Sequence, residues 1–183
     1  MRTAVILFAS FVPVAIIFHK AFFAPNDYVF EKNGDGVMYY YTLAYHLKYD
    51  SNLLRTGAML YPYGESIFYM GAAPLLPLLL KPISDYIYDL SSWSVGIYNM
   101  SIFISIALCV FFLTIIFMEH EINVIFAFVF AVGITFLSPQ IHRIPGHFTL
   151  AYSFIIPAMF YFLFKFNKEN KLTWSIFTGI LFI

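Results

Sequence analysis

Apolar residues run along this chain in long blocks, which a few polar stretches separate. Blocks over 95–118, 122–137 and 148–164 have the length and composition of membrane-spanning helices, since a helix needs roughly 20 apolar residues to cross a bilayer. A shorter block over about 3–19 precedes them. A last block over 172–183 reaches about half the needed length before the sequence stops. The pattern predicts an all-α, polytopic transmembrane helix bundle whose last helix is incomplete, as in the front part of a longer protein.

The first block has two interpretations, a cleaved signal peptide or a retained membrane anchor. Residues 21–24 (AFFA) form a poor cleavage site because the small-x-small pattern is missing. We therefore expect an anchor, and both interpretations place the following segment outside the cell.

The segment over 20–94 differs from the rest, because it holds most of the Asp, Gly and Tyr residues of the chain. Its apolar piece over 72–80 is interrupted by Pro74 and Pro77 and is too short to cross a bilayer. That piece is typical of a re-entrant or interfacial helix. Since ordered connections of this length are usually functional, we expect a long, partly helical first loop with a role in the activity.

Positive charges in short loops predict the orientation of the helices. The loop over 165–171 carries three lysines and is expected inside. Counting back, 119–121 is inside, whereas 138–147 and 20–94 are outside, with Arg143 as an exception to the rule. The two polar segments thus share the outer face of the cell's inner (plasma) membrane.

Composition supports the membrane assignment. Hydrophobic residues make up 61% of the chain and charged residues 11%, whereas soluble domains are about a quarter charged. The mean hydropathy is +0.80. A net charge of zero gives no reason to expect a nucleic-acid partner, and a single cysteine excludes an internal disulfide. The partners expected from composition are membrane lipids.

The first candidate for chemistry is Asp35, which lies between two glycines just before a helical pattern. If a helix begins at the second glycine, Asp35, Tyr39, Thr42 and His46 fall on one stripe. An acid, a phenol, a hydroxyl and an imidazole would then line up. Asp35 could instead be the N-cap of that helix, and the two roles are compatible because a capping acid is held in a fixed direction.

Two further acids lie in the same segment. Asp27 is either a turn residue or a functional acid close to the first span. Glu65 follows a turn and is expected to begin a helix, where the helix dipole alone would favour it. It could also join Asp35 as a metal ligand or contact the substrate.

The loop over 138–147 carries the basic candidates His142, Arg143 and His147. Arginine suits bidentate recognition of phosphate, and histidine can carry a proton near neutral pH. Arg143 could instead meet lipid head groups at the interface. The histidine spacing is not that of a zinc motif, and neither a phosphate-binding glycine loop nor a Gly-x-Ser-x-Gly elbow is present.

A first span, a long outer segment with an early acid and tightly connected later spans resemble the GT-C class of membrane glycosyltransferases. The segments 33–36, 61–65 and 138–148 are similar to those of uncharacterised bacterial members. The resemblance covers this whole chain but only the amino-terminal part of such an enzyme. It implies a lipid-linked sugar donor, a polyprenyl-phosphate sugar, used at the outer face.

The resemblance also implies an acid in the first outer loop as general base or metal ligand, with Asp35 as first choice and Asp27 as second. Mg²⁺ or Mn²⁺ is the cofactor that some members of the class would require. The residues expected to contact the substrate are Tyr39, His46, Glu65, His142, Arg143 and His147.

Two other functions compete with sugar transfer. A transporter or flippase-like subunit would bind and move a substrate without bond chemistry, and a structural or assembly subunit would do neither. The scarcity of ionisable residues inside the predicted spans argues against an ion or proton path. The outer segment with Asp35 therefore favours the glycosyltransferase.

Overall fold

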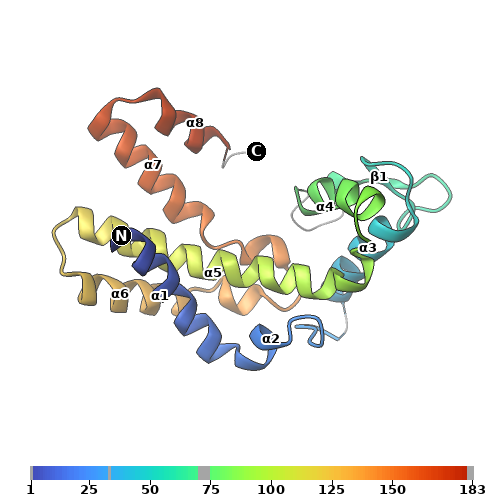
Figure 1. The fold of residues 1–183 in the computed structure, drawn as a ribbon, viewed down its shortest axis with the longest axis horizontal. Helices are drawn as coiled ribbons and strands as arrows, with labels where there is room; N and C mark the ends of the chain where they lie inside the picture. Colours follow the sequence, from blue (N-terminus) through green and yellow to red (C-terminus); the bar gives the residue numbers. More distant parts are fainter. Residues whose placement is uncertain (1, 33, 70–74, 181–183) are drawn as a thin grey trace. The chain divides into compact units, whose positions relative to one another are not determined.

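The computed structural model describes residues 2–32, 34–69 and 75–180. Of the described residues, 72% are helical, and their sheet is one antiparallel pair, in which Arg55 lies opposite Ser66 (Figure 1). The predicted helical class is confirmed at this level. The residues fold into two compact units, which we describe separately.

Unit 1 contains residues 2–17, 103–141 and 152–180. Its elements are α1 (Arg2–Ile17), most of α5 (Ser94–Glu119), α6 (Val124–Leu137), α7 (Ile155–Glu169) and α8 (Leu172–Ile180). The helical segments Ser91–Glu119 and Val124–Arg143 are long and apolar enough to cross a membrane, and α1 is a shorter apolar helix. In Figure 1, α7 and α8 form a hairpin of adjacent helices.

Helix α6 of unit 1 buries small residues and exposes large ones. In α6, Ala127, Ala131 and Thr135 are buried at a spacing of four, whereas Phe126 and Phe130 are exposed. Small residues on one face let helix backbones approach closely, as in membrane helix pairs. At the other end of α5, Glu119 pairs with Lys165 at 2.6 Å and with Lys168 at 3.0 Å, so the carboxyl ends of α5 and α7 meet.

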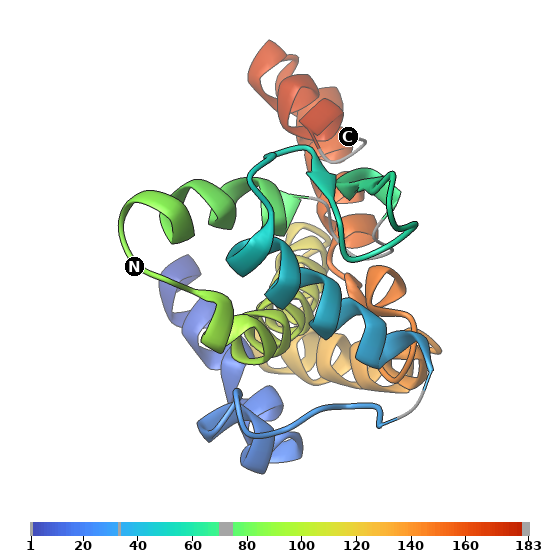
Figure 2. The ribbon, with the colours of Figure 1, turned by 90° about the vertical axis from the view of Figure 1, so that its right-hand side faces the viewer.

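Unit 2 contains residues 18–102 and 142–151, with 33 and 70–74 outside the described part. Its elements are α2 (His19–Phe23), α3 (Asp35–Tyr49), β1 (Arg55–Thr56), β2 (Glu65–Ser66), the short helices η1 (Ile67–Tyr69), η2 (Ser91–Trp93) and η4 (Phe148–Ala151), α4 (Leu75–Tyr86) and the start of α5. Figure 2 shows α3 beside the start of α5.

The core of unit 2 is aromatic. The rings of Tyr39, Tyr40 and Tyr98 surround Phe148, with centroids 4.9 to 5.6 Å away. The Tyr40 hydroxyl donates to Asn99 Oδ1 at 2.6 Å, and burial raises the pKa of Tyr40 to about 12. The side-chain amide of Asn99 in turn donates to the carbonyls of Pro25 and Tyr28. Asn99, at the start of α5, therefore connects α3 with the segment that precedes α3.

Two elements differ from the expectations. The helix expected over 148–164 begins only at Ile155, because Phe148 is buried in the core of unit 2 and Pro157 favours the first turn of a helix. Glu65 does not begin a helix but lies in β2, ahead of the turn η1. Of the apolar piece over 72–80, the described part is helical from Leu75 onward.

Candidate functional site

The start of α3 is organised by Glu31, an acid that the sequence pattern did not single out. Glu31 Oε2 accepts a hydrogen bond of 3.0 Å from the backbone N–H of Gly36. The first amides of a helix lack partners within the helix, and a carboxylate is favoured there by the dipole. The N-cap position itself belongs to Gly34, whose φ of 90° suits glycine. The expectation that Asp35 is the N-cap is therefore wrong, and Glu31 satisfies the helix end instead.

Glycines pack closely around the Glu31 carboxylate. A Cβ atom placed on Gly36 would lie 2.6 Å from Glu31 Oε2 and 3.3 Å from the backbone nitrogen of Gly146. A Cβ on Gly146 would lie 3.1 Å from the same oxygen. The loop that contains Gly146 therefore lies directly against the start of α3, more than a hundred positions earlier in the sequence.

Asp35 is the first residue of α3, and its side chain is exposed. Among the described residues it accepts no hydrogen bond from another side chain or amide. Burial raises the pKa of Tyr39, and the negative charges of Asp35 and Glu31 raise it further. The charges of both acids therefore reach the Tyr39 phenol, and we call Glu31 and Asp35, which lie just before and at the start of α3, the acidic pair.

The loop over 142–151 alternates between buried and exposed side chains. Ile144 and Phe148 are buried and anchor the loop in unit 2. His142, Arg143 and His147 are exposed. The structure therefore brings this basic loop to the same unit as Asp35 and leaves all three basic side chains accessible to a ligand.

The predicted polar stripe of α3 exists but faces the interior. Tyr39, Thr42 and His46 have exposed fractions of 6%, 0% and 0%. The helical spacing was correct, but the side chains pack in the core instead of lining an open site. Tyr39 and His46 are therefore not accessible as direct substrate contacts in this structure.

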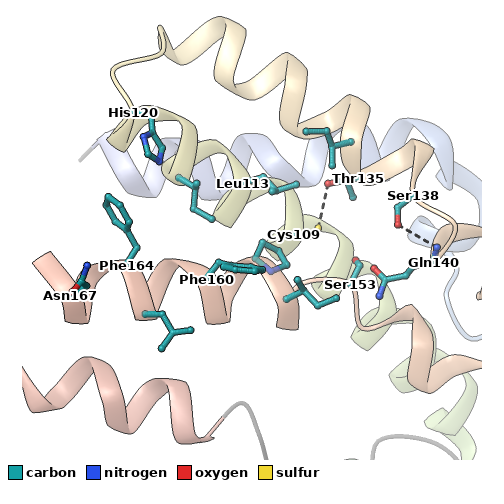
Figure 3. Close-up of a pocket in the computed structure, with 15 residues that line it drawn as sticks. Cys109, Leu113, His120, Thr135, Ser138, Gln140, Ser153, Phe160, Phe164 and Asn167 are labelled. Carbon is teal, nitrogen blue, oxygen red and sulfur yellow. Dashed lines mark hydrogen bonds between the residues drawn. The ribbon is translucent and has the colours of Figure 1, made fainter.

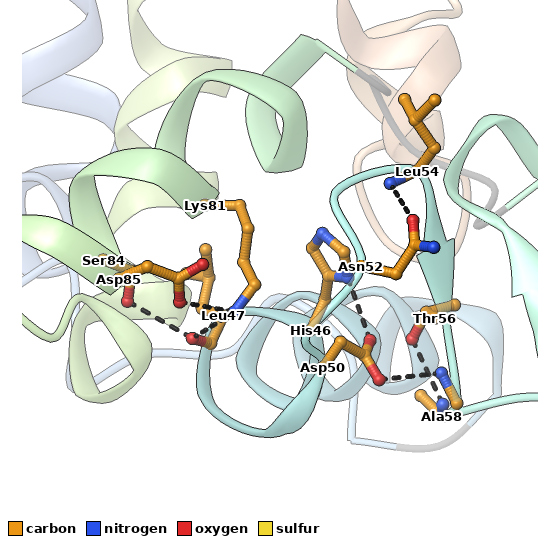
Figure 4. A network of polar contacts seen from close by, with 11 residues as sticks. His46, Leu47, Asp50, Asn52, Leu54, Thr56, Ala58, Lys81, Ser84 and Asp85 are labelled. Carbon is orange, nitrogen blue, oxygen red and sulfur yellow. Dashed lines mark hydrogen bonds and ion pairs between the residues drawn. The ribbon is translucent and has the colours of Figure 1, made fainter.

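His46 belongs to a separate polar network at the end of α3 (Figure 4). Its Nδ1 lies 2.9 Å from Asp50 Oδ2, and Asp50 Oδ1 accepts the amide of Gly57 at 2.9 Å. The buried Nε2 of His46 has no partner in the described part of the chain. Asp50 and Arg55 line a small polar cavity of about 320 Å³ in this region. The network fastens the 50–66 hairpin to α3.

The other two predicted acids lie in surface positions. Asp27 is exposed in a turn, where its amide donates to the carbonyl of Ala24. Its neighbour Asn26 makes the structural contacts, to the Ser92 carbonyl and the Gly96 amide. Glu65 lines a shallow cavity with Arg55 beside the strand pair. No observation joins Asp27 or Glu65 to the acidic pair of Glu31 and Asp35.

Unit 1 holds an elongated apolar cavity of about 670 Å³ between α5, α6 and α7 (Figure 3). Its middle is lined by residues such as Leu113 and Phe160. His120 and Asn167 lie at one end, and Ser138 and Gln140 at the other. The sequence did not indicate this cavity, because its walls come from three helices whose packing no local pattern specifies.

The described side chains do not build a dedicated metal cage, since no three of their His, Cys, Asp or Glu residues form a group that could hold an ion. Glu31 and Asp35 provide two carboxylates. Mg²⁺ is commonly held by one or two carboxylates together with substrate phosphates and water. This donor set fits only an ion that a phosphate ligand helps to bind.

Comparison with known proteins gives one family. The family model described as a domain of unknown function (DUF6311) matches residues 6–183. No curated protein and no solved structure matches the chain.

Proposed function

We propose that this chain, which belongs to the DUF6311 family, is a membrane glycosyltransferase. It moves a sugar from a polyprenyl-phosphate donor to an acceptor at the outer face of the plasma membrane. The observation that carries the proposal is the packing of Gly146 against Gly36 and Glu31, which collects an acidic pair and a basic loop in one unit. The resemblance to the GT-C class supplies the reaction type.

In the proposed reaction Asp35 is the general base. Its exposed carboxylate takes the proton of an acceptor hydroxyl while that oxygen forms a bond to the anomeric carbon. The bond between the anomeric carbon and the phosphate oxygen breaks, and the polyprenyl phosphate leaves with the electron pair. Glu31 is a positioning residue, because it fixes the helix start from which Asp35 projects.

The basic loop stabilises the leaving phosphate. Arg143 can bind two phosphate oxygens at once, and such contacts strengthen as negative charge develops. His142 and His147 are also exposed on this loop and add hydrogen-bond donors. A divalent cation carried by the donor would be held by Asp35 and Glu31 and would neutralise phosphate charge.

The membrane placement of the proposal rests on unit 1. Its two long apolar helices are proposed as membrane spans. The ion pairs of Glu119 with Lys165 and Lys168 join the ends of α5 and α7, which supports an orientation with the 119–121 connector and the 165–171 loop both inside. The apolar cavity between α5, α6 and α7 has a lining suited to part of a lipid chain.

The proposal is tested by sugar transfer in membranes that contain the full chain, with a radiolabelled polyprenyl-phosphate sugar as donor. We expect Asp35→Asn to reduce the rate by about 10²–10⁴, the usual contribution of a general base. Arg143→Ala should reduce it by about 10²–10³, as loss of a charge-stabilising donor does. Asp27→Asn tests the second candidate acid.

Two exposed residues provide matched controls. Glu121→Gln removes an acidic side chain, as Asp35→Asn does, and Lys48→Ala removes a positively charged side chain, as Arg143→Ala does. Both should keep the parental rate. Unchanged transfer in Asp35→Asn contradicts the assigned base. If the donor crosses vesicle membranes intact and no transfer occurs, the protein is a transporter and the enzyme proposal fails.

A further inference from the structure

Helix α4 presents its apolar side to the outside of unit 2. Leu75, Leu79, Ile83 and Ile87 follow one another at a spacing of four, and their exposed fractions are 58%, 64%, 39% and 79%. Ile87 continues the helix, because its amide donates to the Ile83 carbonyl at 2.9 Å. At 3.6 residues per turn these side chains share one face. We call them the α4 stripe.

The opposite face of α4 carries the buried residues of the helix, Pro77 and Lys81, and its polar contacts to α3. Lys81 has an exposed fraction of 3%, and its Nζ lies 2.6 Å from Asp85 Oδ1 and 3.4 Å from the Leu47 carbonyl. The Ser84 hydroxyl donates to the same carbonyl at 3.3 Å, as Figure 4 shows. An amphipathic helix in a soluble domain normally has the reverse arrangement, with its apolar face inward.

The polar contacts fix the rotation of α4 about its axis. The Leu47 carbonyl is one of the last four of α3, which lack partners within their own helix. A cation is favoured at that end by the helix dipole. Lys81 and Ser84 therefore have a defined partner in the protein, and turning the α4 stripe inward would break both contacts.

The chain connection determines what lies near the stripe. Only residues 87–90 separate α4 from the apolar segment Ser91–Glu119. Because a chain extends at most about 3.6 Å per residue, the end of α4 lies within roughly 18 Å of the start of that segment. Tyr86, Tyr88 and Trp93 are exposed around this point. Tyrosine and tryptophan are enriched where a protein passes from water into lipid.

We propose that α4 is an interfacial helix that lies in the outer surface of the membrane, with the α4 stripe in contact with lipid chains. Amphipathic helices bind a bilayer in this way, with the apolar face in the boundary between head groups and acyl chains. The partner is the lipid bilayer itself. This proposal uses the assignment of α5 as a membrane span but not the glycosyltransferase activity.

Single labels on the purified full chain in phosphatidylcholine vesicles test the proposal. Cys109→Ala removes the native thiol, and Leu79→Cys or Ile83→Cys then carries a fluorescent label. A spin-labelled lipid quenches labels in the bilayer, and iodide quenches labels in water. We expect both α4 labels to be quenched several-fold more by the lipid than by iodide. Lys48→Cys, which is exposed on α3, should show the reverse.

A label at Phe130→Cys on the exposed face of α6 separates the two assumptions. If the lipid quenches this label while iodide quenches the α4 labels, the interfacial helix is refuted and the assignment of the membrane span stands. If all labels report water, the membrane placement fails as well. If the α4 labels are shielded from both quenchers, another protein surface covers the stripe and the proposal is also refuted.

Discussion

The carboxylate of Glu31 lies against two glycines from distant parts of the chain. Its Oε2 accepts the Gly36 amide, and a Cβ atom placed on Gly146 would lie 3.1 Å from the same oxygen. Space at this point exists only because Gly34, Gly36 and Gly146 have no side chains. Two of the three, Gly34 and Gly146, also have positive φ angles that other residues rarely adopt. Glycine is therefore required here for both packing and conformation.

Gly36→Ala should destabilise the protein by about 1–3 kcal/mol, the usual cost of inserting a methyl group into a filled site. The new Cβ would lie 2.6 Å from Glu31 Oε2 and would displace the carboxylate. Thermal unfolding in detergent, followed by tryptophan fluorescence, measures the loss.

Gly133→Ala is the matched control, because it also lies within a helix but has no atom within 4 Å of the new Cβ. There the higher helix propensity of alanine should raise stability by up to about 1 kcal/mol. Equal effects of the two substitutions would show that the glycine packing around Glu31 is not tight.

Among the elements, α3 and α4 are joined by polar contacts as well as by packing. Lys81 and Ser84 of α4 both donate to the Leu47 carbonyl near the end of α3. Ser84 also accepts the amide of Leu90 and so extends the contact to the segment before α5. These bonds give a hydrogen-bond partner to a carbonyl at the end of α3 that has none within its own helix. They connect α3, α4 and the segment before α5 within unit 2.

Lys81→Met should lower the free energy of unfolding by about 1–3 kcal/mol. The thioether keeps much of the length of the side chain but donates no hydrogen bond, so Asp85 loses its ion-pair partner. Chemical denaturation of the two proteins in detergent measures the difference. Lys48→Met, at an exposed position of the neighbouring helix, should change stability by less than about 0.5 kcal/mol. A Lys81→Met protein as stable as the Lys48→Met protein would rule out the capping role.

At the scale of the whole molecule, the chain returns after two long apolar helices to complete unit 2. Residues 142–151 belong to that unit, although 103–141 belong to the other. Phe148 anchors the returning segment in unit 2, because its fully buried ring contacts Tyr39, Tyr40 and Tyr98. The apolar anchor and the exposed basic side chains alternate, so one short loop both completes the core and presents Arg143.

Phe148→Ala should cost about 3–5 kcal/mol, as for other phenylalanine truncations in cores. The loop should loosen as its anchor is lost, and trypsin should then cleave after Arg143 at an increased rate. Leu150→Ala removes a half-exposed side chain from the same loop and should leave the cleavage rate unchanged. Equal cleavage in both variants would mean that Phe148 does not hold the loop.

Several features followed from the sequence because they depend on local patterns. The apolar blocks over 95–118 and 122–137 became α5 and α6, and the helix expected from Gly36 begins one residue earlier, at Asp35. The stripe of Tyr39, Thr42 and His46 also formed, since helical periodicity is fixed once the helix exists. Block length, composition and residue spacing suffice for such features.

The tertiary structure alone decided which way these faces point and which distant residues meet. The α3 stripe faces a core of tyrosines, so its polar groups are buried, whereas the apolar face of α4 is exposed because Lys81 has its partner on α3. Glu31 can act as the acid at the start of α3 because three glycines leave room for its carboxylate. One of these glycines lies in a loop far along the chain. A sequence pattern specifies the period of an element but not its neighbour, because burial depends on the surface that the rest of the fold brings to it.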